Sequence, residues 1–278
     1  GGVVGARAGE ADEARAEAGK SRGLTEKGTD NDGKPVKNQG GTLARSRGTV
    51  KVAKGRTDDN GQGSLTLASA SAITATVTAT AGSVSDTTDV TFEQVALTVS
   101  ASALDSSGGN ANGIVFGEKS PTYAWAGAQL KLDVAGTTGA VSWSSASPAV
   151  STSGSVVTIH EKATGVKLTG TDSAGHTVVY TLNTPGWVKY LSTDKAAYGV
   201  AQSTCSGNGG GIMSKAVMQA IYDGWGNLYA YNGWIRQYYM TSTAYANGTV
   251  SATNNYAFWG ETGLWVKNSW ATTAFACY

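Results

Sequence analysis

Short runs in which hydrophobic and polar residues alternate occupy much of the first two thirds of the chain. Residues 73–79 read Ile-Thr-Ala-Thr-Val-Thr-Ala, and this period of two predicts a half-buried β-strand. Similar runs at 49–52, 64–67 and 88–92 are separated by turns such as the Asp-Asp-Asn-Gly sequence at 58–61, whose glycine tolerates a positive φ. The pattern predicts an antiparallel β-sandwich.

Residues 95–185 repeat the pattern with other details. Runs at 95–99 and 129–134 alternate again and predict strands, and a loop rich in glycine and asparagine lies between them at 106–113. Trp143 stands in the strand-like run Val-Ser-Trp-Ser-Ser and is expected to pack between two sheets, because strand tryptophans commonly fill sandwich cores. A ligand contact is the alternative interpretation of this residue. These features predict a second sandwich.

The pattern changes after residue 186. A short strand is expected at 187–190, and the side-chain oxygens of Ser-Thr-Asp at 192–194 predict a capped helix over 195–204. Apolar residues at helical spacing predict a second helix over 213–223 with one buried stripe, ended by the glycines at 224 and 226. Aromatic-rich runs follow and predict further strands, which gives an α+β domain.

The aromatic residues show where the chain divides. Of 24 Phe, Tyr and Trp residues, 18 lie in 186–278 and none lies in 1–91, so the last third is a domain of a different kind. With domains of about 100 to 150 residues, we expect boundaries at 1–94, 95–185 and 186–278. Residues 1–27 fit least well, because they lack β-branched alternation and are rich in Ala, Glu and Arg, which favour a helix or disorder. Either the first strands are degenerate there or the segment is poorly ordered.

Charge and composition exclude several classes of protein. The 21 basic and 20 acidic residues give a net charge of +1, which offers no electrostatic footprint for nucleic acid or an anionic membrane. No apolar run approaches the roughly 18 residues of a membrane-spanning helix, and a chain that starts with Gly-Gly is expected to be a piece of a longer protein. Two histidines and two cysteines are too few for a zinc site of the common spacings. No metal or other cofactor is expected.

The cysteines are Cys205 and Cys277. In a Ser/Thr-rich, repeat-built chain they favour a single disulfide and an oxidising compartment, such as the bacterial surface or the periplasm. Such a bridge removes on the order of 4 kcal/mol of unfolded-chain entropy in a simple loop model. Two buried free thiols are the alternative.

Two sets of motifs in the first two thirds of the chain resemble known domains. Residues 32–36 (Asp-Gly-Lys-Pro-Val), the turn at 57–61 and the Ala-Thr-Val-Thr-Ala strand resemble the first type of bacterial immunoglobulin-like domain, the repeat of the surface stalks of intimin and invasin adhesins. Residues 143–150, 154–158 and 163–168 resemble the second type of such domain. Two immunoglobulin-like sandwiches are therefore implied.

The last third resembles the C-terminal lectin-like domain of the intimin and invasin family, with intimin the nearer. The order and spacing of residues 187–189 (Trp-Val-Lys), Cys205 at a helix end, 221–226 (Ile-Tyr-Asp-Gly-Trp-Gly) and 234–237 (Trp-Ile-Arg-Gln) carry this resemblance. The tail also resembles the last strands of C-type lectin-like folds. The implied fold class is two all-β immunoglobulin-like sandwiches followed by an α+β C-type lectin-like domain.

Two departures bear on the ligand. In calcium-dependent lectins the tryptophan of the penultimate strand is followed by Asn and Asp ligands, whereas Trp265 is followed by Val266 and Lys267. Calcium needs six to eight oxygen ligands, so calcium-dependent sugar binding is not expected. An integrin-binding relative presents an aspartate on a loop, and Glu261 is the sole acid in the late loops. Invasin-like integrin binding is thus the weaker alternative.

The resemblance implies a bacterial adhesin at the outer-membrane cell surface, anchored by an upstream barrel. Its immunoglobulin-like domains hold the lectin-like domain out toward a host-cell receptor protein, with a translocated bacterial receptor or an integrin as the candidates. Binding energy at interfaces concentrates in aromatic and arginine anchors, and the late segment, residues 255–270, supplies aromatic residues densely. The expected receptor contacts are Trp259, Glu261, Trp265, Lys267, Asn268 and Trp270, of which Trp265 and Trp270 suit the core equally well.

Two other functions are alternatives to adhesion to a protein. A carbohydrate-binding module would stack sugar rings on the aromatic side chains, with Asn254, Asn255 and Asn268 as amide partners. An enzyme would need a Ser-His-acid set or a carboxylate pair. The last 93 residues contain no histidine, and their three acids are scattered, so catalysis is not expected.

Overall fold

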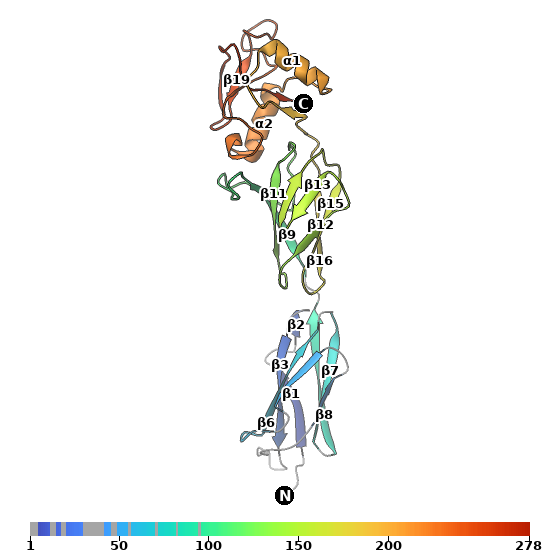
Figure 1. The fold of residues 1–278 in the computed structure, drawn as a ribbon. Coiled ribbons are helices and arrows are strands. Elements are labelled where there is room, and N and C mark those ends of the chain that lie inside the picture. Colours follow the sequence, from blue (N-terminus) through green and yellow to red (C-terminus); the bar gives the residue numbers. More distant parts are fainter. Residues whose placement is uncertain are drawn as a thin grey trace. The chain divides into compact units, whose positions relative to one another are not determined.

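The structure is a computed structural model that describes residues 57–69, 72–81, 83–93 and 96–278 and, before residue 57, the backbone of five strands. The chain forms two compact units, one of residues 1–96 with 173–176 and the other of residues 97–172 with 177–278 (Figure 1). The motif at 32–36 lies outside the described residues. Each unit is considered separately below.

The first unit is a sandwich of two four-stranded sheets, with strand orders β1-β3-β6-β5 and β2-β8-β7-β4. In β7 the residues at every second position are buried, as the alternation predicts, and Ala75 and Val77 pack with Leu65 and Phe92. The strands are β1 Gly5–Ala11, β2 Arg15–Glu17, β3 Ser21–Thr29, β4 Thr42–Arg45, β5 Thr49–Lys54, β6 Gln62–Ala68, β7 Thr74–Ala81 and β8 Val84–Glu93.

Within residues 1–27, the segments whose backbone the structure describes are the strands β1, β2 and β3 and not the helix that the composition favours. β1 pairs with β3, and β2 pairs with β8 in parallel. Strand formation depends strongly on the partners that a segment meets in a sheet, and these pairings override the local preference.

The second unit begins with another sandwich, whose sheets have the orders β10-β9-β11-β14-β13 and β12-β15-β16. Trp143 is 7% exposed, which confirms it as a core residue. A Cβ at Gly170 would lie 2.9 Å from the Trp143 ring, so glycine makes room for the indole. The strands are β9 Thr98–Leu104, β10 Val115–Gly117, β11 Gln129–Ala135, β12 Ser142–Ser144, β13 Val150–Ser153, β14 Val156–Ile159, β15 Val166–Thr171 and β16 Thr177–Leu182.

The unit ends with two helices and two small sheets, ordered β17-β21 and β18-β19-β20. Together with the sandwiches they confirm the expected fold class. The elements are β17 Tyr190–Leu191, α1 Tyr198–Gly207, α2 Lys215–Trp225, the 3₁₀ helix η1 Leu228–Ala230, β18 Tyr238–Met240, β19 Tyr256–Trp259, β20 Leu264–Lys267 and β21 Ala276–Cys277.

Both helices start later than the sequence predicts. α1 begins at Tyr198 and its N-cap, Ala197, makes no side-chain cap. The preceding segment is extended because Ala196 forms a β-bridge with Thr273, and Ser192 accepts a hydrogen bond from Phe275 N at 2.9 Å and does not cap the helix. Tertiary pairing therefore sets where α1 starts.

The second helix is capped by a side chain that the prediction placed inside it. Ser214 Oγ accepts a hydrogen bond from Val217 N at 3.2 Å. Gly224 lies within the helix, which ends at Trp225 and is capped by Gly226, where φ is +78°. The buried stripe of α2 faces the sandwich side of the unit through Trp225.

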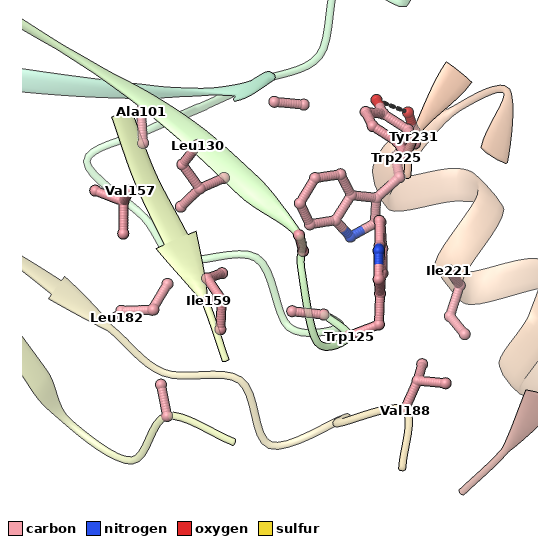
Figure 2. Close-up of a cluster of buried hydrophobic side chains, with 14 of the residues drawn as sticks. Ala101, Trp125, Leu130, Val157, Ile159, Leu182, Val188, Ile221, Trp225 and Tyr231 are labelled. Carbon is pink, nitrogen blue, oxygen red and sulfur yellow. Dashed lines mark hydrogen bonds between the residues drawn. The ribbon is translucent and has the colours of Figure 1, made fainter. Parts of the chain in front are cut away.

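The sandwich and the C-terminal part of the second unit share one hydrophobic core (Figure 2). The Trp125 ring packs at 4.6 Å from Trp225, 5.5 Å from Trp234 and 5.7 Å from Tyr231 between ring centroids. Trp225 Nε1 donates to Tyr123 O at 2.8 Å. The two parts are thus joined by buried aromatic surface, and residues 97–278 are expected to fold as one cooperative unit.

A loop of the sandwich also fastens the two parts. Asn112 Nδ2 lies 3.0 Å from Trp225 O, Asn227 O and Tyr231 Oη. The loop is shaped by the buried carboxylate of Asp105, which accepts hydrogen bonds from four donors in Ser107, Gly109 and Ala111.

These bonds, with the Ala111 N–H first and the Ser107 hydroxyl next, lower the pKa of Asp105 to about 2. A carboxylate that is bonded in the folded state stabilises the fold only while it is ionised.

Replacing Asp105 with asparagine should lower the free energy of unfolding of this unit by about 2 kcal/mol at pH 7, because an amide cannot accept all four bonds. The pKa of an aspartate in the unfolded chain is about 3.9. The ionised Asp105 carboxylate therefore stabilises the folded state above about pH 4, and this stabilisation is lost as the pH falls toward about 2. Urea unfolding at pH 7 and at pH 3 measures the free energy of unfolding. The difference in this free energy between the native chain and D105N should be smaller at pH 3 than at pH 7. An equal difference at both pH values would contradict the stabilising role of the Asp105 carboxylate. The control is Asp133→Asn, on the exposed side of β11.

Candidate functional site

The late strands expected to contact a receptor form the sheet β18-β19-β20. In its register Tyr238 lies opposite Trp259, and Trp259 lies opposite Leu264. Residues directly opposite in a sheet share a face, so these three side chains form one row across the strands. Phe258 and Trp265, also opposite one another, lie on the other face.

One side of the sheet carries a connected set of aromatic rings. The Trp270 ring stacks on Tyr238 at 4.3 Å, Tyr238 packs on Trp259 at 4.9 Å, and Trp259 meets Tyr229 edge-on at 5.0 Å. Trp270 is 43% exposed. We call these four residues with Arg236 and Glu261 the aromatic face.

Charge is placed at one end of the aromatic face. Arg236 and Glu261 form an ion pair at 2.6 Å, and the guanidinium carbon lies 5.3 Å from the Trp259 ring centroid. Arginine over an aromatic ring gains cation–π attraction. The carboxylate of Glu261 is thus paired with Arg236 on the surface of the protein.

Tyr229 supports this face from below. Burial raises the pKa of Tyr229 to about 12, so its hydroxyl is neutral; it donates to Gln237 O and accepts from Gly260 N at 3.0 Å. These two bonds fix the turn between β19 and β20 against the segment that carries Arg236.

The opposite face of the sheet carries a second cluster. Lys215 Nζ lies 4.2 Å from the Tyr256 ring centroid and 5.5 Å from that of Trp265. The Trp265 ring packs on Phe258 at 4.6 Å, and its Nε1 donates to Gln219 Oε1 at 2.8 Å. The aromatic rings on this side of the sheet thus face α2, which carries Lys215 and Gln219.

The structure separates the six residues expected to contact a receptor. Trp259, Glu261 and Trp270 lie together on the aromatic face, whereas Trp265 packs on the opposite side and Lys267 lies beside it on the exposed strand β20. Asn268 is 4% exposed, so it holds the structure from within and we leave it out of the proposed contact surface.

The asparagines offered as sugar-binding groups are engaged inside the protein. Asn268 Nδ2 donates to Asn255 Oδ1 at 3.1 Å, and Asn255 donates to the carbonyl of Ser251 at 2.9 Å. Asn254 bonds the backbone of Ala246 through both of its side-chain atoms. These amides therefore fasten the loop before β19.

Tyr229, Tyr238 and Arg236 are members of the aromatic face that the sequence does not predict. The pairing of Tyr238 opposite Trp259 in the sheet places it on this face. The three residues of β18 carry no alternation, because Tyr238 is partly exposed and both Tyr239 and Met240 are buried. Arg236 lies in a loop and has no periodic signal, so its contact with Glu261 needed the fold.

The predicted disulfide is present between Cys205 and Cys277. It joins α1 to β21, and both residues are fully buried. The backbone of Cys277 also pairs with Tyr190 in β17 and with Ile212. The bridge therefore ties the C-terminal strand to α1.

Among the described residues no group of three or more His, Cys, Asp or Glu side chains is placed to hold a metal ion. The same residues contain no helix long and apolar enough to cross a membrane.

Comparison with known proteins gives the following relatives. No protein-family model matches the sequence. Intimin of Citrobacter freundii is 28% identical over 224 residues, which cover 74% of this chain and 23% of that protein. Intimin of Escherichia coli O127:H6 (strain E2348/69 / EPEC) is 28% identical over 209 residues, 71% of this chain and 21% of that protein. The chain thus spans less than a quarter of the length of these relatives.

Solved structures share the fold. The C-terminal 282-residue fragment of intimin, solved in complex with the intimin-binding domain of the translocated intimin receptor, has a TM-score of 0.56 and 23% identity and covers 99% of this chain and 100% of that fragment. Invasin, described as a bacterial integrin-binding protein, has a TM-score of 0.52 and 16% identity, covering 98% of this chain and 59% of its own. The resemblance to intimin and invasin inferred from the sequence is confirmed.

Proposed function

We propose that this chain is the receptor-binding part of a bacterial adhesin displayed at the outer-membrane cell surface, and that it binds without catalysing a reaction. The observation that carries the proposal is the aromatic face, which lies on a lectin-like domain with the fold of the receptor-bound intimin fragment. Interfaces concentrate their energy in Trp, Tyr and Arg residues, and this face supplies all three.

The contact surface proposed here is smaller than the late segment as a whole. It comprises Trp259, Glu261 and Trp270 from the sequence prediction, joined by Tyr238 and Arg236. Trp270 and Arg236 are the members most open to solvent, because the Arg236 side chain is 62% exposed and Trp270 43% exposed. They are the proposed anchors.

The proposed partner is a host-cell surface protein, or a bacterial receptor placed in the host membrane as in the intimin complex. Glu261 is paired with Arg236, so binding the metal of an integrin would first have to break this ion pair, which makes the invasin-like mode the weaker one. A sugar ligand would lack the amide partners that stacking platforms need, because Asn254, Asn255 and Asn268 bond within the protein. A protein partner therefore fits the surface best.

Binding of the whole purified chain to fixed mammalian cells tests the proposed function. Binding should be saturable and should persist in the presence of a metal chelator and after glycosidase treatment of the cells. Loss with chelator would instead assign integrin-like binding, and loss after glycosidase would assign a sugar ligand. Cells that carry the translocated receptor should be compared with cells that lack it, and saturable binding to neither would contradict the proposal.

A further inference from the structure

The strand β20 forms an open edge of the late sheet. It pairs with β19 alone, since the strand order is β18-β19-β20. Each of its four residues is partly or well exposed, and Leu264 is 50% exposed. Soluble proteins usually protect edges with charge, because open edges pair with other chains.

The backbone groups that point away from the sheet belong to Trp265 and Lys267. Asn268 N donates to Asn255 O at 2.9 Å, and directly bonded pairs alternate along an antiparallel ladder. Leu264 and Val266 therefore bond to β19. The remaining two residues direct their N–H and C=O groups outward, and none of the hydrogen bonds found among residues 96–278 uses these groups.

The charge beside this edge is positive. Lys215 lies over Tyr256 and Trp265, and Lys267 lies at the end of β20. In the described part of the chain neither lysine forms a salt bridge. A strand added at this edge would meet the lysines on one side and the row of Trp259 and Leu264 on the other.

We propose that β20 is a strand-addition site for an extended segment of the partner protein, with acidic side chains facing Lys215 and Lys267 and apolar side chains facing Leu264. Strand addition draws its affinity from main-chain hydrogen bonds and its selectivity from alternate side chains. The inference rests on the proposed function in that the partner is the receptor.

A second copy of this chain is the less favourable occupant. Pairing of β20 with the same strand of another copy would bring four lysines, two Lys215 and two Lys267, to one seam. Like charges across a strand pair are destabilising. An acidic segment offsets that charge, so the proposal commits to a partner of that chemistry.

A designed peptide provides the test without the receptor. The probe is a nine-residue peptide, acetylated and amidated at its ends, in which glutamate and valine alternate. The control has the same sequence with N-methylated backbone nitrogens at every second residue, which removes the donors that face β20. Binding to the whole 278-residue chain is followed by NMR, through the amide signals of Trp265 and Lys267.

The probe should bind, slow the hydrogen exchange of these two amides and weaken at least ~10-fold when N-methylated, because the main-chain bonds carry the affinity. Lys267→Pro should weaken it by a similar factor, since the lost N–H points outward and Val266 is already extended. Lys267→Ala should weaken it only ~3-fold, as a partly exposed charge contact is worth little, and Lys195→Ala should have no effect.

Equal binding of the N-methylated peptide, or exchange that is unchanged at both amides, would overturn the proposal; neither result depends on the folding of a variant. A dimer in sedimentation that Lys267→Pro dissolves would also overturn it, by assigning the edge to a second copy. Because the peptide assay uses no cells, its failure would leave the cell-binding result, and with it the proposed function, standing.

Discussion

Replacing Trp225 with alanine is expected to lower the free energy of unfolding of residues 97–278 by about 3–5 kcal/mol. Trp225 is 1% exposed, packs on Trp125 and on Phe116 at 5.2 Å, and donates to Tyr123 O. Truncation leaves a cavity between the sandwich and the C-terminal part of the unit, and it leaves the carbonyl of Tyr123 without its donor.

The same variant tests whether the unit is cooperative. Calorimetry of the native chain should show one transition for residues 97–278, and W225A should move that whole transition to lower temperature. The matched control is Phe92→Ala, which empties the core of the first sandwich and should shift only the transition of that unit. Separate melting of the immunoglobulin-like and lectin-like parts of W225A would contradict the shared core.

Removing both anchors of the aromatic face, as Arg236→Ala with Trp270→Ala, is expected to weaken binding to the receptor at least ~30-fold, or about 2 kcal/mol. Both side chains are well exposed, so the fold should keep its melting temperature. Trp270 offers a stacked indole on Tyr238, and Arg236 lies over Trp259. Equilibrium binding to receptor-bearing cells measures the effect.

Much of the fold follows from the sequence because periodicity reports burial directly. The alternation in 73–79 places Ala75 and Val77 inside the first sandwich, and the isolated Trp143 marks the core of the second. The late start of α1 was not predicted, because it depends on the pairing of Ala196 with Thr273, 77 residues further along the chain. Local capping signals carry no information about such a contact.

The sequence predicts which segment of the chain carries the candidate site, but it does not predict which of its side chains share one surface. The density of aromatic residues drew attention to 255–270, yet a strand sends neighbouring side chains to opposite faces. Trp259 of β19 lies opposite Leu264 of β20 and shares its face, so Trp265, the residue after Leu264, points to the other side. Arg236 lies in a loop beside the aromatic face. Asn268 is buried, and its side-chain amide donates a hydrogen bond to Asn255.

The ratio of receptor affinities between two matched double variants is the most direct test of the central claim. One variant replaces Arg236 and Trp270 of the aromatic face with alanine. The other is Lys195→Ala with Val200→Ala, which removes a cation just before α1 and an exposed apolar side chain on α1. The account predicts at least ~30-fold weaker binding for the first and unchanged binding for the second. Equal affinities, with both variants folded, would contradict it.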